Sequence, residues 1–257
     1  MPESGQADAV KIVAIGDVHG NWPTLWRVLR ASGAADSEYR PSPALRDGRI
    51  KVVCLGDLLY YRDDLAYSQA AGVEPYDSNN PEHLRRAARA QFRELYRLQG
   101  FVEAAQGNLT VLLGNLDDAA VCGNYRIQTR TGTPCNEFDP QAGGLELPEQ
   151  LRSWLESFPR EIVINGVHFA HAGPTPGMQQ YDDFFYYDSD AAQWWRTKPE
   201  LFSQTGHRFG VYGHAKMQDG IYVNSEQSFA MIDTLGRQQY MELIVSSERL
   251  GYSLLQL

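Results

Sequence analysis

The chain has 257 residues, of which 43% are hydrophobic and 21% charged, so it has the composition of an ordinary globular protein and enough length for one large α/β domain. Its formal net charge of −9 argues against a nucleic-acid partner, because phosphate backbones are bound by basic surfaces. No apolar run reaches the length of a membrane span and the polar residues 1–10 hold no secretory signal, so we expect no membrane partner and a cytoplasmic location.

The first half of the chain alternates short apolar runs with segments of helical spacing. We predict strands from runs that stop abruptly at Gly or Asn, at 11–15, 49–55 and 109–113. Apolar residues three and four apart predict helices at 21–31, 81–105 and 149–157, and Pro23 suits the start of the first. Residues 32–49 and 123–148 are rich in Gly and Pro and are predicted as loops. Residues 60–80 show no periodicity, so we predict an insertion over the sheet edge.

The helix predicted at 81–105 carries a run of arginines: Arg85, Arg86, Arg89, Arg93 and Arg97. In an acidic protein such a run favours a solvated helix face over a nucleic-acid stripe.

The second half of the chain is rich in strands. Asn165-Gly166 between two apolar runs predicts a hairpin joining 162–164 to 167–170. Further strands are predicted at 209–212, 221–224, 229–233, 239–244 and 252–257, and aromatic residues gather at 181–195. No linker divides the sequence, so we expect a single domain over residues 1–257.

Five short segments place metal-binding residue types at the ends of predicted strands. They are Gly16-Asp17-Val18-His19-Gly20, Gly56-Asp57, Gly114-Asn115, His171-Ala172-Gly173 and Gly213-His214, and they contain three of the six histidines. Ligands collect at the carboxyl edge of parallel strands. One such segment would be an ordinary turn, but five together indicate a metal centre. The three cysteines are too scattered to form a disulfide framework or a zinc cluster of their own.

The order and spacing of these segments resemble the calcineurin-like metallophosphoesterase superfamily, over most of the chain. Phe169-Ala-His-Ala-Gly-Pro174 and Ile232-Asp233-Thr234 make it most similar to the protein-phosphatase-like bacterial branch and the diadenosine-tetraphosphatase relatives. The resemblance implies a four-layer α/β/β/α sandwich with two mixed sheets.

The resemblance also implies two divalent metal ions. Asp17, His19 and Asp57 would hold one ion, and Asp57 would bridge to a second held by Asn115, His171 and His214. Oxygen ligands with a few imidazoles suit Mn²⁺ best, with Fe or Zn²⁺ also possible. Two such ions lie about 3.5–4 Å apart and activate a bridging water as hydroxide for attack on phosphate.

The chain departs from the family pattern at the residues that protonate the leaving group. Leu116 stands where the family has a histidine, and Tyr60 stands where it has the aspartate that orients that histidine. The catalytic acid is therefore unknown. Either the substrate has a leaving group that needs little protonation, or Asp117 or Asp118 supplies the proton through a raised pKa.

Several other side chains are candidates for contact with the substrate. Arg62 and the amide of Asn115 could bind phosphate, with Arg126, Arg130 and Arg196 as weaker candidates. Tyr60 and Tyr61 either line the pocket or pack against the sheet edge. Trp194 and Trp195 either form a substrate wall or cover the second sheet. His83, His168 and His207 are interpreted as structural.

The leading hypothesis is a dinuclear phosphatase that hydrolyses phosphomonoesters, of a phosphoprotein or a small molecule, or phosphoanhydrides. A phosphodiesterase is the first alternative, although Gly213-His214-Ala215-Lys216 lacks the second histidine of that branch. A non-catalytic metal-binding scaffold is the second, motivated by the loss of both residues of the acid pair.

Overall fold

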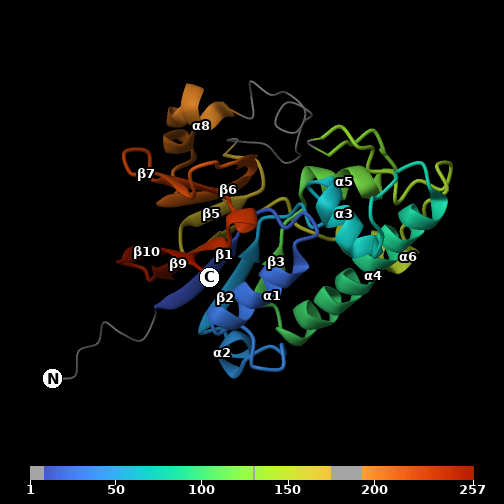
Figure 1. Ribbon diagram of the computed structural model, residues 1–257. Coiled ribbons are helices and arrows are strands. Elements are labelled where there is room, and N and C mark those ends of the chain that lie inside the picture. The colour runs from blue at the N-terminus through green and yellow to red at the C-terminus, as the bar shows by residue number, and fades with distance from the viewer. Residues whose placement is uncertain (1–8, 130, 175–192) are drawn as a thin grey trace.

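Two five-stranded sheets pack face to face, and helices cover their outer faces (Figure 1). The computed structural model describes residues 9–129, 131–174 and 193–257. The first sheet has the strand order β10 (Leu250–Gln256), β9 (Gln239–Val245), β1 (Val10–Ile15), β2 (Ile50–Cys54), β3 (Leu109–Val111). The second has the order β4 (Glu161–Ile164), β5 (Val167–Ala170), β6 (Phe209–Lys216), β8 (Phe229–Asp233), β7 (Tyr222–Asn224).

Each sheet is mixed and has three neighbouring parallel strands. These are β1, β2 and β3 in the first sheet and β5, β6 and β8 in the second. The antiparallel pairs are β1 with β9, β9 with β10, β4 with β5, and β7 with β8. The carboxyl ends of the parallel strands carry the segments singled out in the sequence.

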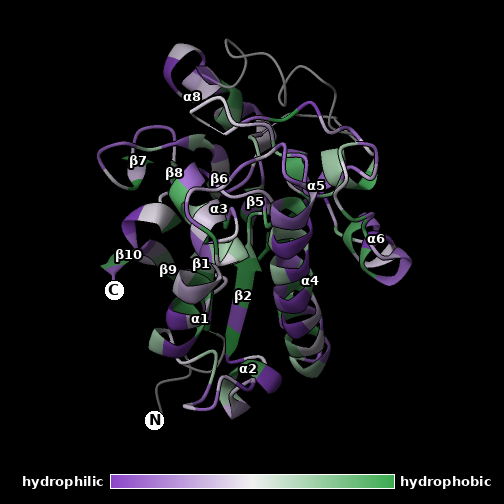
Figure 2. Ribbon diagram, turned by 45° about the vertical axis from the view of Figure 1, so that its right-hand side comes forward, coloured by the Kyte–Doolittle hydropathy of each residue, from purple (hydrophilic) through white to green (hydrophobic). Residues whose placement is uncertain are grey.

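The helices lie between and after these strands. They are α1 (Trp22–Ala31), α2 (Pro43–Arg46), α3 (Asp64–Ala71), α4 (Pro81–Ala104), α5 (Asn115–Val121), α6 (Glu149–Glu156) and α8 (Trp194–Thr197), with 3-10 turns η2 (Pro199–Thr205) and η3 (Leu235–Arg237). No helix in the described ranges is both long and apolar enough to cross a bilayer. The longest, α4, turns a hydrophilic side outward, while β2 beside it is mostly hydrophobic (Figure 2).

The alternation of side chains along β1 divides the interior into layers. Ile12 and Ala14 face the second sheet, where they meet Phe169 and Val211 in the core between the sheets. The intervening Val13 and Ile15 join the core beneath the helices. Side chains with opposite directions at successive positions make this possible.

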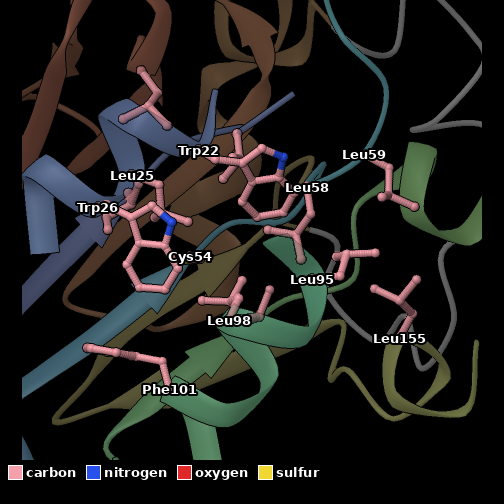
Figure 3. Packing of buried hydrophobic residues seen from close by; sticks show 14 of the residues in the cluster. Trp22, Leu25, Trp26, Cys54, Leu58, Leu59, Leu95, Leu98, Phe101 and Leu155 are labelled. Carbon is pink, nitrogen blue, oxygen red and sulfur yellow. The ribbon is translucent and has the colours of Figure 1, made fainter. Parts of the chain in front are cut away.

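The core under the helices is built from α1, α4 and β2. Trp22 and Trp26 of α1 lie opposite Leu95 and Leu98 of α4, with Cys54 of β2 between them (Figure 3). A third apolar cluster, which includes Trp194 and Phe202, covers the outer face of the second sheet. The result is the predicted α/β/β/α sandwich, and that prediction is confirmed.

Most predicted elements are present, and the described residues also contain four helices that were not predicted: α2, α3, α5 and α8. The first two have local causes. Residues 32–49 contain α2, which begins after Ser42, and residues 60–80 contain α3, which begins after Asp63. In each case the capping side chain accepts a backbone N–H, from Leu45 at 3.1 Å and from Ala66 at 2.9 Å. The loop prediction was therefore wrong for residues 43–46, while α3 lies within the predicted insertion, for which no helix was predicted. The third helix, α5, begins directly at Asn115.

Some strand boundaries also differ from the prediction. The strand β6 extends beyond residue 212 to Lys216, and its pairing with β8 shifts register between Tyr212 and Lys216. The hairpin at Asn165-Gly166 is present, with both residues at positive φ (50° and 80°), as its turn requires. All three cysteines are free. The expectation of one domain over residues 1–257 stays a prediction.

Candidate metal centre

The six predicted ligands converge where the parallel strands of the two sheets end. Asp17 follows β1, Asp57 follows β2, Asn115 follows β3 and His171 follows β5, while His214 lies within β6. Hydrogen bonds and close approaches, described below, join all of these segments to one another.

Asp57 is the most connected of the six residues. Its backbone carbonyl accepts hydrogen bonds from the N–H groups of Val18 and His19, at 3.1 and 2.7 Å. Its Oδ1 accepts the N–H of Leu116 at 2.9 Å. Asp57 therefore ties the loop after β1 to the start of α5, and the residue is 3% exposed.

Asp17 forms the equivalent link to the second sheet. Both of its carboxylate oxygens accept the backbone N–H of His214, at 3.0 Å each. This approach requires glycine at position 213, where an added Cβ would lie 2.2 Å from Asp17 Oδ1. Gly114 has the same function beside Asp57, whose backbone nitrogen would lie 2.2 Å from an added Cβ.

Three donor atoms meet on the other side of Asp57. Asn115 Oδ1 lies 3.0 Å from His171 Nε2 and 2.9 Å from His214 Nδ1, and the two imidazole nitrogens are 3.3 Å apart. His171 Nδ1 donates to the carbonyl of Leu55 at 2.7 Å, which leaves Nε2 to face Asn115. A histidine fixed in this way through its other nitrogen is typical of metal ligands.

His19 completes the group on the side of Asp17. Its Nε2 lies 3.8 Å from Asp17 Oδ2 and 3.8 Å from Asp57 Oδ2. Among the described residues, two sets of side chains could each surround a cation: Asp17 with Asp57 and His171, and Asp17 with His19 and Asp233. His19, Asp57 and His214 all have positive φ, a strained backbone conformation for residues other than glycine that is common at functional sites.

Asp233 was not predicted as a site residue. It lies at the end of β8, is 3% exposed and forms an ion pair with Arg62. A signal was present in the sequence, because Asp233 follows the apolar run 229–232 as Asp17 and Asp57 follow theirs.

The titration of these residues reflects burial and mutual charge. Burial and the neighbouring His171 lower the pKa of His214 to about 4, so its ring is neutral at neutral pH. Burial alone would lower the pKa of His171, but the carboxylates of Asp57 and Asp17 raise it above its ordinary value. Burial opposes ionisation of Asp17, but His171, His19 and Arg62 hold its pKa below the usual range. Burial and Asp17 raise the pKa of Asp233 to about 6.

The donor set fits divalent metal ions. Ligand atoms around one first-row ion lie about 3–4 Å apart, as metal–ligand distances near 2.1 Å require. The donor pairs described above are separated by 2.9 to 3.8 Å. Buried carboxylates this close together also need positive charge, because their mutual repulsion is weakly screened away from water.

A cavity of about 240 Å³ opens beside these residues. Arg62, Asn115 and Lys216 line it together with His19 and Asp57. Tyr60 and Tyr61 also reach its wall, but both are almost fully buried and pack on Phe138 and Tyr67 respectively.

Asp117, one of the two residues considered as alternative proton donors, is held away from this cavity. Asp117 is fully buried, and its carboxylate accepts the backbone N–H groups of Leu58, Leu59 and Gly114 at 2.9, 3.2 and 3.3 Å. Burial and Asp57 raise its pKa to about 8, so it can hold a proton, but its hydrogen bonds point into the protein. Asp118 lies 3.8 Å from Arg160. Leu116, at the position where the resemblance implies a catalytic acid, lines the cavity.

The other candidates that the structure describes are two tryptophans and two arginines. Trp194 and Trp195 are buried and cover the second sheet, and Trp194 Nε1 donates to the carbonyl of Ala172 at 3.0 Å. Arg126 and Arg196 are exposed, and Arg196 lies over the ring of Trp195 at 4.1 Å. Arg130 and most of the aromatic stretch 181–195 lie outside the described residues.

The histidines interpreted as structural make local contacts. His168 contacts Tyr212 OH at 2.9 Å and Glu161 at 3.1 Å, and it stacks on His207. His83 accepts the backbone N–H of Asp77 at 3.1 Å.

The family of the chain follows from comparison with known sequences. The family model described as calcineurin-like phosphoesterase matches residues 10–234, so the chain belongs to that family. The family is metal-dependent and acts on phosphorylated substrates, and the cluster of Asp17, Asp57 and His171 is a candidate metal site. No curated protein matches the sequence of this chain.

Solved structures of low sequence identity share the fold. A putative diadenosine tetraphosphatase is 16% identical with a TM-score of 0.53, and the match covers 97% of this chain and 95% of that one. A mutant of a cold-active protein tyrosine phosphatase is 18% identical with a TM-score of 0.58, covering 96% and 80%. A protein serine/threonine phosphatase from Saccharomyces cerevisiae is 13% identical with a TM-score of 0.54, covering 99% and 82%.

Proposed function

We propose that this protein is a phosphatase that hydrolyses phosphomonoesters or phosphoanhydrides with the help of two divalent metal ions, preferably Mn²⁺. The observation that carries the proposal is that carboxylates, an amide and imidazoles from five separate segments come together, each with an atom within 4 Å of another member of the group. The donor chemistry favours Mn²⁺, and Fe or Zn²⁺ would also be accepted.

The residues divide between two positions. Asp17, His19 and Asp57 would hold one ion, and Asp57, Asn115, His171 and His214 the other, with Asp233 close to the first. Ions bound there supply positive charge to the phosphate oxygens and lower the pKa of a water molecule. The hydrogen bond from His171 Nδ1 to Leu55 fixes the ring with Nε2 directed at this position.

Two further groups are suited to the phosphate itself. The ion pair with Asp233 holds Arg62 at the cavity wall, and the remaining N–H groups of its guanidinium can donate to phosphate oxygens. Asn115 directs its Oδ1 at the two imidazoles, so its amide N–H₂ is left for the substrate.

The leaving group then decides which esters are hydrolysed quickly. In the reaction water adds to phosphorus, the ester P–O bond breaks, and the leaving oxygen departs with a proton or as an anion. Leu116 cannot donate that proton, and the carboxyl of Asp117 is bonded to three backbone N–H groups. A general acid typically raises the rate of such a reaction by about 10²–10⁴-fold. Without one, we expect a preference for aryl phosphates and phosphoanhydrides, because their leaving groups need little protonation.

Release of nitrophenol from p-nitrophenyl phosphate in the presence of Mn²⁺ tests the proposal. We expect turnover well above that of metal alone, loss of turnover on chelation, and much slower hydrolysis of an alkyl phosphate. No turnover with both ions demonstrably bound would reject a phosphatase and favour the metal-binding scaffold. Faster hydrolysis of bis-p-nitrophenyl phosphate than of the monoester would instead favour a phosphodiesterase.

A further inference from the structure

A second, larger cavity adjoins the candidate metal centre. It has a volume of about 790 Å³ and lies between α1, α3 and α4, and we call it the α1–α4 groove. His19, Tyr61 and Arg62 line both this groove and the smaller cavity at the metal centre. A molecule bound at the metal centre can therefore extend into the groove. The volume lies in the range that small-molecule ligands occupy.

The groove is basic in an otherwise acidic protein. Its lining includes four arginines, Arg27, Arg62, Arg93 and Arg97, against two acidic residues, Asp63 and Glu94, in a chain of net charge −9. Glu94 is already engaged, because its Oε2 accepts Trp26 Nε1 at 3.0 Å and lies 3.6 Å from Arg97. Clustering of positive charge in a concave surface attracts anions.

Two arginines of the groove, Arg27 and Arg97, are held by their neighbours. The guanidinium of Arg97 lies 4.0 Å from the centre of the Trp26 ring and 5.6 Å from that of Tyr39. Arg27 donates to the hydroxyl of Thr24 at 3.2 Å. Trp26 itself is buried and packs edge-on against Phe101. A guanidinium fixed in this way loses less conformational entropy when it binds an anion than one on a free side chain.

We propose that the α1–α4 groove binds a second anionic group of the substrate, and that the substrate is a small molecule with more than one phosphate. This inference rests on the proposed function, because it assigns the scissile phosphate to the metal centre. The remaining phosphates would lie against Arg27, Arg93 and Arg97. The shared recognition chemistry is a phosphate chain, which either an inorganic polyphosphate or a nucleoside polyphosphate supplies.

Calorimetric binding to the full-length protein, at a fixed concentration of free Mn²⁺, tests this inference. The probes are orthophosphate, tripolyphosphate and the non-hydrolysable β,γ-methylene analogue of ATP. The test variant carries Arg27→Gln with Arg97→Gln. The matched control carries Arg86→Gln with Arg89→Gln, which removes the same charge from a part of α4 outside the groove lining. Nitrophenyl phosphate hydrolysis is measured in parallel, because that ester has a single phosphate and therefore no second anionic group for the groove.

We expect the unmodified protein to bind tripolyphosphate at least tenfold more tightly than orthophosphate. The groove variant should lose about tenfold in tripolyphosphate affinity and keep its orthophosphate affinity and nitrophenyl phosphate turnover, while the control keeps all three. Tighter binding of the ATP analogue than of tripolyphosphate would assign the ligand to the nucleoside polyphosphates, and the reverse order to inorganic chains. If the double variant does not fold, Arg93→Gln, at a side chain 73% exposed, replaces it.

Equal affinities for orthophosphate and tripolyphosphate would overturn the inference, and so would equal losses in the groove variant and the control. The inference would also be overturned if the groove variant lost affinity for a phosphopeptide but kept its affinity for tripolyphosphate. That result would indicate a protein substrate. Groove-dependent binding without any turnover would reject the proposed function and leave the groove as an anion site. Turnover without groove-dependent binding would support the proposed function and overturn the inference about the groove.

Discussion

Asp57 is the residue on which the proposed chemistry depends most directly. We expect Asp57→Asn to reduce Mn²⁺-dependent hydrolysis of nitrophenyl phosphate by at least about 100-fold. Loss of a residue that only hydrogen-bonds to a metal ligand typically lowers metal affinity or activity about 10–100-fold, and Asp57 is proposed as a ligand itself. The amide keeps an oxygen for the N–H of Leu116, and the change removes the charge of one buried carboxylate that lies close to two others, Asp17 and Asp117. Thermal stability should therefore fall little, as a melting curve would show.

Asp219→Asn provides the matched control for that experiment, since it makes the same change at an exposed position. Its activity should equal that of the unmodified protein. If Asp57→Asn also remained fully active, the hydrolysis would belong to a contaminant and the metal assignment would be wrong.

The sequence predicts which side chains meet at this site but not all of the contacts that arrange them. The six proposed ligands stand out because each lies in a segment that follows a stretch predicted as a strand, and parallel strands end at one edge of a sheet. In the structure β6 continues through His214 to Lys216. The role of the six residues as ligands stays a prediction. Asp233 forms an ion pair with Arg62, and Asp117 accepts the backbone N–H groups of Leu58 and Leu59. These contacts were not predicted, because they join segments that are far apart in the chain.

At the scale of elements, Asp117 fastens the start of α5 to the loop after β2. Asp117→Ala would leave three buried N–H groups without acceptors, those of Leu58, Leu59 and Gly114. Each unsatisfied buried group costs about 1–3 kcal/mol, so we expect the free energy of unfolding to fall by at least about 3 kcal/mol in urea titrations. The neighbouring Asp118→Ala removes only a contact of 3.8 Å with Arg160, and should cost about 1 kcal/mol or less.

The same two variants separate a positioning role for Asp117 from proton donation. A positioning residue should affect aryl and alkyl phosphates by the same factor. A selective loss on alkyl phosphates in Asp117→Ala would instead identify it as the proton donor and contradict the interpretation given above.

The elements that could be predicted are those whose own side chains repeat with a clear period. The helix α4 has apolar residues three and four apart over its whole length and was predicted within one residue of its end. In contrast, α3 has only two buried residues, Tyr67 and Ala71, so its segment shows no period. The start of α5 coincides with the proposed ligand Asn115, and no element was predicted between the strand at 109–113 and the loop at 123–148.

At the scale of the whole molecule, strand order was beyond the reach of sequence patterns. The strand β1 pairs with β9, more than two hundred residues later, and β5 pairs with β6 across the stretch 175–192. Local periodicity identifies each strand but carries no information about its distant partner. The layered sandwich could be predicted only because the motif order resembles a known family, and the family match confirms it.

A buried glutamate outside the proposed metal centre, Glu137, makes the stability of the whole fold depend on pH. Glu137 is fully buried, and its Oε1 accepts Tyr67 OH and Gln91 Nε2, both at 2.7 Å, while its buried Oε2 has no hydrogen-bond partner among the described residues. Burial raises the pKa of Glu137 to about 7, although the bonds from Tyr67 and Gln91 act to lower it. In the unfolded chain the pKa would be near the ordinary value of 4.5.

Because the folded protein holds this proton more tightly, its stabilising effect is complete below pH 4.5 and is lost as the pH rises to about 7. The loss amounts to about 3 kcal/mol of unfolding free energy. We expect Glu137→Gln to remove this dependence and to be more stable than the unmodified protein at pH 8 but not at pH 4.5, in urea titrations at both values. The control Glu103→Gln, at an exposed position on α4, should follow the unmodified protein at both pH values. A constant difference between Glu137→Gln and the unmodified protein across this range would mean that Glu137 remains ionised in the folded state, held by Tyr67 and Gln91.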